Sequence, residues 1–108
     1  MRPISNVELR FTPRSANNLQ TIHAYCAKTW GTDQADNYIV RIHNVLELIR
    51  LNPFIGRQRA EFGADIRSYP AEWHLIFYSV IGNIVIIRTI LHARMDIPQR
   101  LPPMDQSE

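Results

Sequence analysis

The first residues of the chain alternate between apolar and polar side chains. In the segment VELRF, residues 7–11, every second side chain is apolar, a period typical of a half-buried strand. The pattern changes at Thr12 and Pro13. A threonine hydroxyl can cap a helix, and proline fits the first helical position because no N–H is needed there. The sequence therefore predicts a strand over 7–11 and a helix that begins at Pro13.

Two consecutive segments then repeat apolar residues at helical spacing. Gly31 is expected to end the first helix and Thr32 to cap the second at once, so the two helices must pair antiparallel. Trp30 is expected in the core at this junction. Asn52-Pro53 ends the second helix, since proline disfavours the helical conformation of the residue before it. The apolar stripes are Leu19, Ile22, Cys26 and Trp30, then Ala35, Tyr38, Ile39, Ile42, Val45, Leu46 and Ile49.

Residues 65–92 are the part of the chain richest in β-branched and aromatic side chains. They predict strands over 65–69, 73–81 and 84–92, with Gly82-Asn83 as a two-residue hairpin turn. From Phe54 to Gly63 the periodicity disappears, which indicates a loop. The fold class that follows is α+β, in the order strand, helix, helix, strand, strand, strand. The helical hairpin would pack on one face of a small, mainly antiparallel sheet.

The turn at Gly82-Asn83 also fixes a register for the last hairpin. Ile81 then opposes Ile84, Phe77 opposes Arg88 and Trp73 opposes His92, and opposed residues share a face. Burial of Arg88 under the helices would be costly, so the face without Arg88 should pack on them. A one-residue slip would exchange the two faces. The expected helix-free face is Trp73, Leu75, Phe77, Ser79, Ile84, Ile86, Arg88, Ile90 and His92, and the expected helix-side face is His74, Ile76, Tyr78, Val80, Val85, Ile87, Thr89 and Leu91.

The expected helix-free face is more apolar than a monomer normally exposes. It must be covered by the C-terminal tail, by a second copy or by a partner chain. The tail over 93–108 contains three prolines and ends in polar residues. We expect one domain over 1–101 and a disordered tail over 102–108.

Composition narrows the class of protein. The chain has 108 residues, 45% of them hydrophobic and 20% charged, which is typical of a globular domain. Eleven of its twelve basic residues are arginine; this suits an interface that binds carboxylates or phosphates, although codon bias in a GC-rich genome explains the count equally well. The single cysteine, Cys26, suits a reducing compartment. Without an apolar signal peptide or membrane-spanning run, the protein is expected in the cytoplasm.

Four segments in this order carry a resemblance: TWGTDQADNY, NPFIGRQRAEFGADIRSY, HLIFYSV and IVIIRTILHARMD. Together they resemble the RelE/ParE superfamily of toxins from toxin–antitoxin systems, over roughly residues 7–101, and ParE more than RelE. The resemblance implies a toxin that poisons DNA gyrase by binding, with no cofactor and without known catalytic residues. It also implies a ParD antitoxin, whose extended and partly helical segment wraps the toxin.

The alternative within the superfamily is a ribosome-dependent mRNA interferase of the RelE or YoeB kind. By position, Glu61 could act as base, Arg67 and Arg88 as phosphate clamp and His92 as acid. Three observations argue against this enzyme. Ala93 follows His92 where the YoeB-like pattern has an aromatic residue, the connector 54–63 lacks lysine, and a net charge of +2 is low for binding among ribosomal phosphates. A homologue that binds its antitoxin without toxicity is a third possibility.

The remaining expectations concern individual side chains. A partner-binding surface is expected from Arg67, Trp73, Leu75, Phe77, Arg88, His92 and Arg94. Arg67 and Arg88 could instead be structural, in pairs with Asp65, Glu72 or the C-terminal tail. Arg57 and Arg59 could contact gyrase, or simply be solvated. His23 and Cys26 share a helix face without a second pair of ligands, so no metal is expected. Direct nucleic-acid binding is not expected either.

Overall fold

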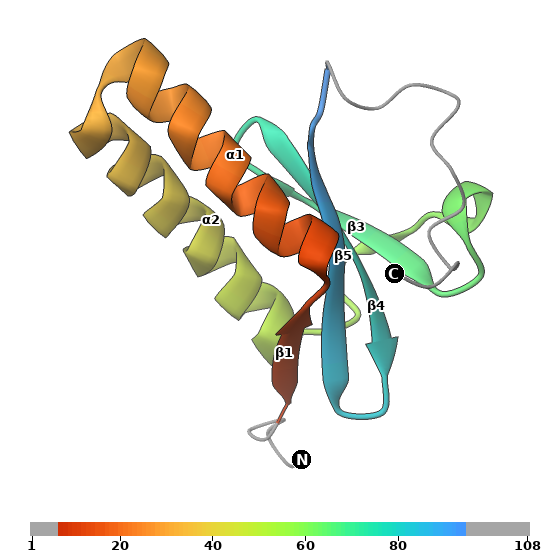
Figure 1. Cartoon of the computed structure of the whole chain (residues 1–108). Coiled ribbons are helices and arrows are strands. Elements are labelled where there is room, and N and C mark those ends of the chain that lie inside the picture. The colour runs from red at the N-terminus through yellow and green to blue at the C-terminus, as the bar shows by residue number, and fades with distance from the viewer. Residues whose placement is uncertain (1–6, 95–108) are drawn as a thin grey trace.

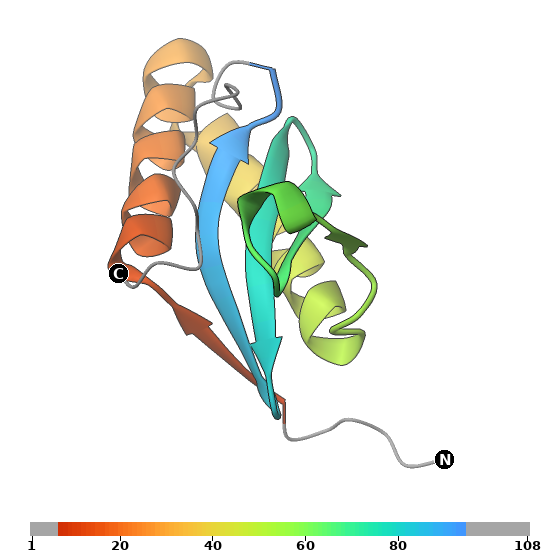
Figure 2. The same ribbon diagram turned by 90° about the vertical axis from the view of Figure 1, so that its right-hand side faces the viewer.

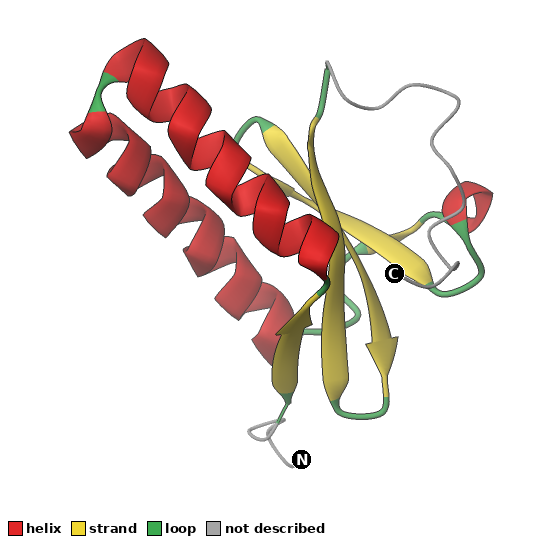
Figure 3. Ribbon diagram, viewed as in Figure 1, coloured by secondary structure: helices red, strands yellow, loops and turns green. Residues whose placement is uncertain are grey.

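The computed structural model describes residues 7–94, which form two layers (Figure 1). Two helices lie on one face of a five-stranded sheet whose strand order is β1-β5-β4-β3-β2 (Figure 3). β1 is parallel to β5, and the other neighbours are antiparallel. The elements are β1 (Glu8–Phe11), α1 (Pro13–Trp30), α2 (Thr32–Leu51), β2 (Arg57–Gln58), the 3-10 turn η1 (Ala60–Phe62), β3 (Ile66–Ala71), β4 (His74–Ile81) and β5 (Ile84–His92).

The predicted fold class and element order are confirmed, with one addition. The segment predicted as a loop contains β2 and η1, because Arg57 and Gln58 pair with Ser68 and Arg67 at the edge of the sheet. Two residues are too few to produce a recognisable alternation, so the sequence pattern did not reveal this strand. The expected tail, 102–108, lies outside the described residues. Neither α1 nor α2 is apolar enough over a sufficient length to cross a bilayer.

Thr12 caps α1 and joins it to the sheet. Its Oγ1 accepts a hydrogen bond from the Ser15 amide at 3.1 Å and donates one to the Arg88 carbonyl at 2.8 Å. The Thr12 amide itself donates to the Ile87 carbonyl at 3.1 Å. The predicted cap is therefore confirmed. The same residue also ties the start of α1 to β5.

A single residue, Gly31, connects the two helices. Its φ of 98° is in the region that favours glycine. Its amide donates to the Ala27 carbonyl at the end of α1, and its carbonyl accepts from the Ala35 amide in α2. The prediction that Thr32 caps the second helix was wrong, since Thr32 is already the first residue of α2. Trp30 was expected in the core and is instead 49% exposed, because it lies at the outer end of this junction.

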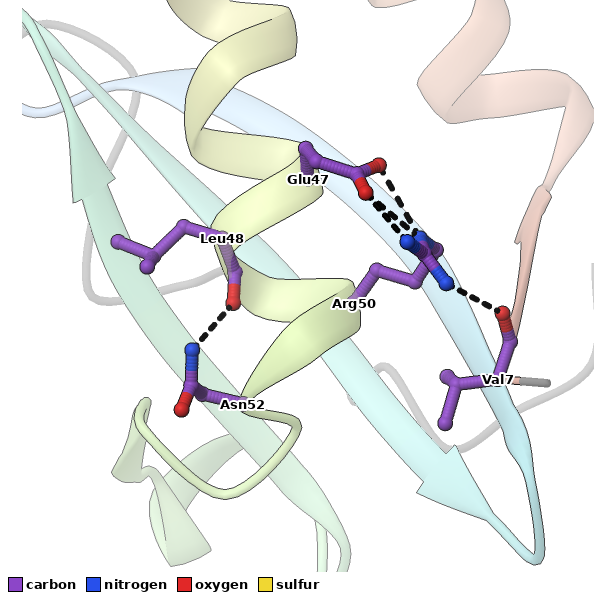
Figure 4. A network of polar contacts seen from close by, with 5 residues as sticks. All are labelled: Val7, Glu47, Leu48, Arg50 and Asn52. Atoms are coloured by element: carbon purple, nitrogen blue, oxygen red, sulfur yellow. Dashed lines mark hydrogen bonds and ion pairs between the residues drawn. The ribbon is translucent and has the colours of Figure 1, made fainter. Parts of the chain in front are cut away.

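The C-terminal end of α2 is tied to Val7, the residue directly before β1 (Figure 4). Arg50 donates from Nη1 to the Val7 carbonyl at 3.3 Å and pairs through Nε and Nη2 with the Glu47 carboxylate. Asn52 ends the helix, with its amide and side chain both bonded to the Leu48 carbonyl. Thr12 and Arg50 thus fix the start of α1 and the end of α2 to the sheet, at the end of the hairpin opposite Gly31.

The core lies between the helices and the sheet. Fully buried side chains from both layers meet there, and Cys26 is among them. At roughly 25 cal/mol for each Å² of apolar surface removed from water, this contact is the main stabilisation of the domain. Its buried members are Val7, Ile22, Cys26, Ala35, Tyr38, Ile42, Leu46, Ile49, Ala71, Ile76, Tyr78, Val85, Ile87 and Ile90.

The β4–β5 hairpin follows the predicted register only as far as Tyr78. Ile81 opposes Ile84 and Tyr78 opposes Ile87, as expected from a turn at Gly82-Asn83. The register then shifts between Phe77 and Tyr78, and Phe77 opposes Thr89. Arg88 is therefore the additional residue of a β-bulge in β5.

Beyond this β-bulge the predicted faces of β5 were wrong. Ile90 was expected on the helix-free face and is part of the core between the layers. Leu91 was expected under the helices and packs with Phe77 on the other side of the sheet. His92 opposes His74 rather than Trp73, on the helix side. One inserted residue causes all three changes, because side chains on a strand alternate with a period of two.

The helix-free face is partly covered by the chain itself. Figure 2, seen from the side away from the helices, shows η1 in front of β4. The Phe62 ring contacts the Phe77 ring edge to face, with a centroid separation of 5.5 Å. Phe77 is fully buried, in a second small core with Ile66, against which Phe62, Leu75 and Leu91 pack. From the sequence, the tail, a second copy or a partner was expected to cover this face. The structure shows that η1 covers part of it, which the sequence did not predict.

Gly56 and Tyr78 fix the path of the chain between α2 and β2. The Tyr78 hydroxyl donates to the Pro53 carbonyl and accepts from the Gly56 amide, both at 2.8 Å. Burial raises the pKa of Tyr78, so its phenol stays protonated and both bonds persist through neutral pH. A Cβ on Gly56 would overlap the Tyr78 hydroxyl and lie 2.9 Å from the Ser68 carbonyl oxygen.

Gly56→Ala should therefore lower the free energy of unfolding by about 2–3 kcal/mol, because the neighbours are backbone and a fully buried ring. Gly82→Ala is the matched control: it has open space around a Cβ but a φ of 61°, and should cost about 1 kcal/mol. Urea unfolding of both variants measures the difference. Equal losses would show that the contact at Gly56 can relax.

Candidate functional site

Arg88 projects from the β-bulge onto the helix-free face. Its Nε donates to the Ser79 hydroxyl at 2.9 Å. Ser79 is 1% exposed and opposes Ile66, so the hydroxyl is fixed on this face of the sheet. Arg88 itself is half-buried. The bulge and the serine together hold the guanidinium over the centre of the sheet.

Arg59 lies on the same face and is held in a similar way. Its Nη1 donates to the hydroxyl of Ser68 at 3.0 Å, and its guanidinium lies over the rings of Phe62 and Phe77 at 5.0 and 5.6 Å. Only 17% of the Arg59 side chain is exposed. Arg59 therefore holds η1 against the sheet. It was predicted as a possible target-binding residue, and the structure shows it engaged within the chain.

One surface contains both serines, the nearby arginines and the apolar side chains between them. We call it the arginine face, and its members are Arg57, Arg59, Ser68, Leu75, Phe77, Ser79, Arg88 and Leu91. Ser68 opposes Phe77, two residues before Ser79 on β4, so the two serines are diagonal neighbours. Arg57 opposes Ser68 from β2 and is exposed. Arginine beside apolar side chains is well suited to bind a carboxylate of a protein segment.

Glu61 is at the edge of the arginine face, in η1. Its carboxylate pairs with Arg59 Nε at 2.9 Å. The hydrogen bond from Arg59 lowers the pKa of Glu61 below its ordinary value. A general base works best with a pKa near the working pH, so this shift makes Glu61 a weaker base.

Arg67 lies on the opposite side of the sheet from Arg88. It opposes Tyr78, which is in the core between the layers. Its Nη1 donates to the carbonyls of Gly56 at 2.8 Å and Phe54 at 3.3 Å, and its guanidinium lies 5.0 Å from the centre of the Phe54 ring. These contacts stabilise the loop that follows α2.

The other predicted residues lie near the far end of β4 and β5. Trp73 is in the turn before β4, not in the strand as predicted, and packs on the helical hairpin. The His92 ring meets the His74 ring with a centroid separation of 5.3 Å. Arg94 is exposed, and its amide donates to His92 Nδ1 at 3.2 Å. The arginine face therefore unites Leu75, Phe77 and Arg88 from the predicted surface, while Arg67, Trp73 and His92 lie on the helix side.

A second candidate surface lies where the helix junction meets the β3–β4 turn. Successive ring centroids are 6.1 Å apart for Tyr25–Trp30, 5.8 Å for Trp30–Trp73 and 6.2 Å for Tyr38–Trp73. We call the hollow among these four rings the aromatic cleft. Of these four residues, the sequence pattern predicted only Trp73 to bind a partner, and it predicted Trp30 and Tyr38 to pack in the core. The signal for the others was an unusual number of aromatic residues around Gly31, but only the folded chain brings Trp73 to them.

Hydrogen bonds of the Tyr38 hydroxyl fix one wall of the aromatic cleft. The hydroxyl accepts from the Trp73 amide at 3.0 Å and lies 2.6 Å from His74 Nδ1. The phenol oxygen accepts from the amide and forms its second hydrogen bond with the imidazole nitrogen of His74. Burial raises the pKa of Tyr38, so its phenol stays protonated at neutral pH.

Two adjoining cavities form the cleft, with volumes of about 200 and 260 Å³. Cys26, Trp30, Tyr38 and Trp73 line both. Burial raises the pKa of the Cys26 thiol, so the thiol stays protonated near neutral pH. The smaller cavity also contacts Ile22 and is almost entirely apolar, whereas the larger one reaches charged side chains.

Arg41 and Glu72 are those charged side chains. Arg41 Nε lies 3.4 Å from Glu72 Oε1, and the Arg41 guanidinium lies 5.6 Å from the centre of the Tyr38 ring. Glu72 has a φ of 58°. A left-handed conformation costs a residue other than glycine on the order of 1 kcal/mol, so the turn holds Glu72 under strain.

Ligands for a metal are not gathered in the described part of the chain. Nowhere in residues 7–94 do three histidine, cysteine or acidic side chains come together as a metal site. His23 pairs instead with Asp36 across the two helices, with Nε2 and Oδ1 2.8 Å apart.

The sequence and the fold of this chain match one family of known proteins. Residues 9–97 match the family described as ParE toxin of type II toxin-antitoxin system, parDE. Toxin ParE1 of Mycobacterium tuberculosis is 33% identical over 92 residues, which cover 83% of this chain and 93% of the relative. Toxin ParE1 of Caulobacter vibrioides is 30% identical over 87 residues, covering 81% of this chain and 90% of the relative.

A solved structure has the same fold at lower identity. It is described as the chromosomal ParDE TA system from P. aeruginosa, and one of its chains superimposes with a TM-score of 0.70. That match has 18% sequence identity and covers 80% of this chain and 95% of the other. The family match spans nearly all of the described residues. The sequence relatives carry the same family name, and the solved structure has the same fold. The chain belongs to the ParE toxin family of type II toxin–antitoxin systems.

Proposed function

We propose that this ParE toxin inhibits DNA gyrase by binding it in the cytoplasm, and that a ParD-like antitoxin neutralises the toxin on its arginine face. The observation that carries a binding mechanism is the separation of the four candidate catalytic groups. Arg88 and Glu61 lie on the helix-free side of the sheet, while Arg67 and His92 lie on the helix side. The chemistry of mRNA cleavage needs a base, an acid and a cation around one phosphate, so this separation favours a toxin that acts by binding.

Charge also supports a protein target. A net charge of +2 is small for a protein that must compete for ribosomal RNA, where contacts with phosphates dominate affinity. The exposed guanidinium of Arg57 is at the edge of the arginine face and is the stronger of the two predicted gyrase contacts, because Arg59 is engaged with Ser68 and Glu61.

The arginine face offers an antitoxin both apolar area and a fixed charge. Leu75 and Leu91 are half-buried around Phe77, which leaves apolar surface beside Arg88. An extended segment with an acidic residue could place apolar side chains on the leucines and a carboxylate on the Arg88 guanidinium. Such a segment would cover the part of this face that η1 leaves open.

The choice of target is tested by inducing the toxin in cells and following DNA damage, translation and message integrity together. Inhibition of gyrase should give an early SOS response and filamentation while mRNA stays intact. Glu61→Gln is a control, because the proposed action does not need a base at this position and toxicity should persist. Rapid arrest of translation with cleaved message, abolished by Glu61→Gln, would instead establish the nuclease.

Docking of the antitoxin is tested by Arg88→Glu. Reversal of the charge should weaken antitoxin binding by about 30-fold or more, since an ionic hydrogen bond is replaced by repulsion at a half-buried site. Lys28→Glu makes the same change of charge on the exposed surface of α1 and should alter the affinity by less than about threefold. Calorimetric titration with purified antitoxin measures both. An unchanged affinity for Arg88→Glu would place the antitoxin on another surface.

A further inference from the structure

We propose that the aromatic cleft binds the side chain of an arginine or lysine presented by a protein partner. The cleft lies at the junction of α1 and α2, on the other side of the sheet from the arginine face. This proposal does not depend on whether gyrase is the target. It rests on the four aromatic rings, on the Glu72 carboxylate and on the Arg41 guanidinium, which lies over the Tyr38 ring.

The walls of the cleft are aromatic and accessible. Tyr25, Trp30 and Trp73 are 58%, 49% and 60% exposed, although they contact one another. Aromatic rings carry negative potential on their faces and attract cations, and tryptophan attracts them most strongly. The three ring pairs are tilted or edge-on, so their faces are not stacked on each other.

Arg41 shows that one wall of the cleft accepts a guanidinium. This group lies over the Tyr38 ring and pairs with Glu72, as an arginine from another protein would. Arg41 and Glu72 are both partly exposed, with 47% and 39% of their side chains accessible, and their separation of 3.4 Å is long for an ion pair. Exposed pairs of this kind contribute little, so an incoming cation can replace Arg41 at small cost.

Glu72 occupies a position where its conformation is unfavourable. Ala71 and His74 are paired, which leaves Glu72 and Trp73 as a two-residue turn. Glycine is the usual residue at the first position of such a turn when φ is positive. The chain has a carboxylate there instead, at the mouth of the larger cavity. Strain of this kind is typical of residues that bind a ligand.

The apolar floor of the cleft suits the stem of a long basic side chain. Ile22 and Cys26 lie beneath the rings in the cavity of about 200 Å³. Arginine and lysine bury their methylene groups along apolar surface while the charged end stays at a polar edge. The stem would lie on this floor and the charge between Tyr38, Trp73 and Glu72.

Tryptophan fluorescence reports on this cleft alone, because the chain has two tryptophans and both line it. The full chain is titrated with N-acetyl-arginine amide, with N-acetyl-leucine amide as the uncharged control. The arginine probe should give a saturable change and bind at least about fivefold more tightly than the leucine probe. Equal or tighter binding of the leucine probe would overturn the proposal in favour of an apolar docking site, and so would the absence of saturation with either probe.

Two substitutions test the roles of the charged residues. Glu72→Gln should weaken binding of the arginine probe about tenfold, because it removes the carboxylate but keeps the shape of the side chain. Arg41→Gln should strengthen it severalfold, because the competing guanidinium is gone. Circular dichroism checks that both variants are folded, and the affinity for the leucine probe should stay unchanged in both. No effect of Glu72→Gln, or weaker binding by Arg41→Gln, would overturn the proposal.

Discussion

The β-bulge at Arg88 decides which side chains each face of this sheet presents. On the turn side of the bulge, Val85 and Ile87 point to the helices, as an unbroken register requires. On its other side, Ile90 takes over that role, and Arg88 itself projects onto the helix-free face. An extra residue in a strand changes the alternation of everything beyond it. This one inserted residue therefore places Arg88 on the helix-free face and Ile90 in the core.

Each face of the sheet uses a different means of excluding water. The helices cover one face with a continuous core fixed by Thr12 and Arg50. On the other face, a short turn contributes one phenylalanine and one arginine, and Arg59 contacts both Phe62 and Phe77. Among residues 7–94 this second cover is small, and Leu75 and Leu91 beside it are only half-buried. Such an arrangement suits a toxin that must be stable alone and still bind an antitoxin.

Hydrogen bonds to hydroxyl groups position several side chains of the two candidate surfaces. Ser68 and Ser79 hold Arg59 and Arg88, and Tyr38 forms hydrogen bonds with His74 and with the amide of Trp73. A side chain with a fixed partner loses less conformational entropy when it binds. The side chains of both candidate surfaces are therefore held in place by contacts within the chain.

The sequence by itself determined the fold class, the helix start at Thr12-Pro13, the junction at Gly31 and the turn at Gly82-Asn83. Each of these depends on local periodicity or on the backbone preference of one residue. Only the tertiary structure decided the faces of β5 beyond Arg88, the cover that η1 provides and the meeting of Trp73 with Trp30. A bulge leaves no mark in the period of a short strand. Contacts between residues far apart in the chain, such as Trp30 and Trp73, arise only when the helices have docked on the sheet.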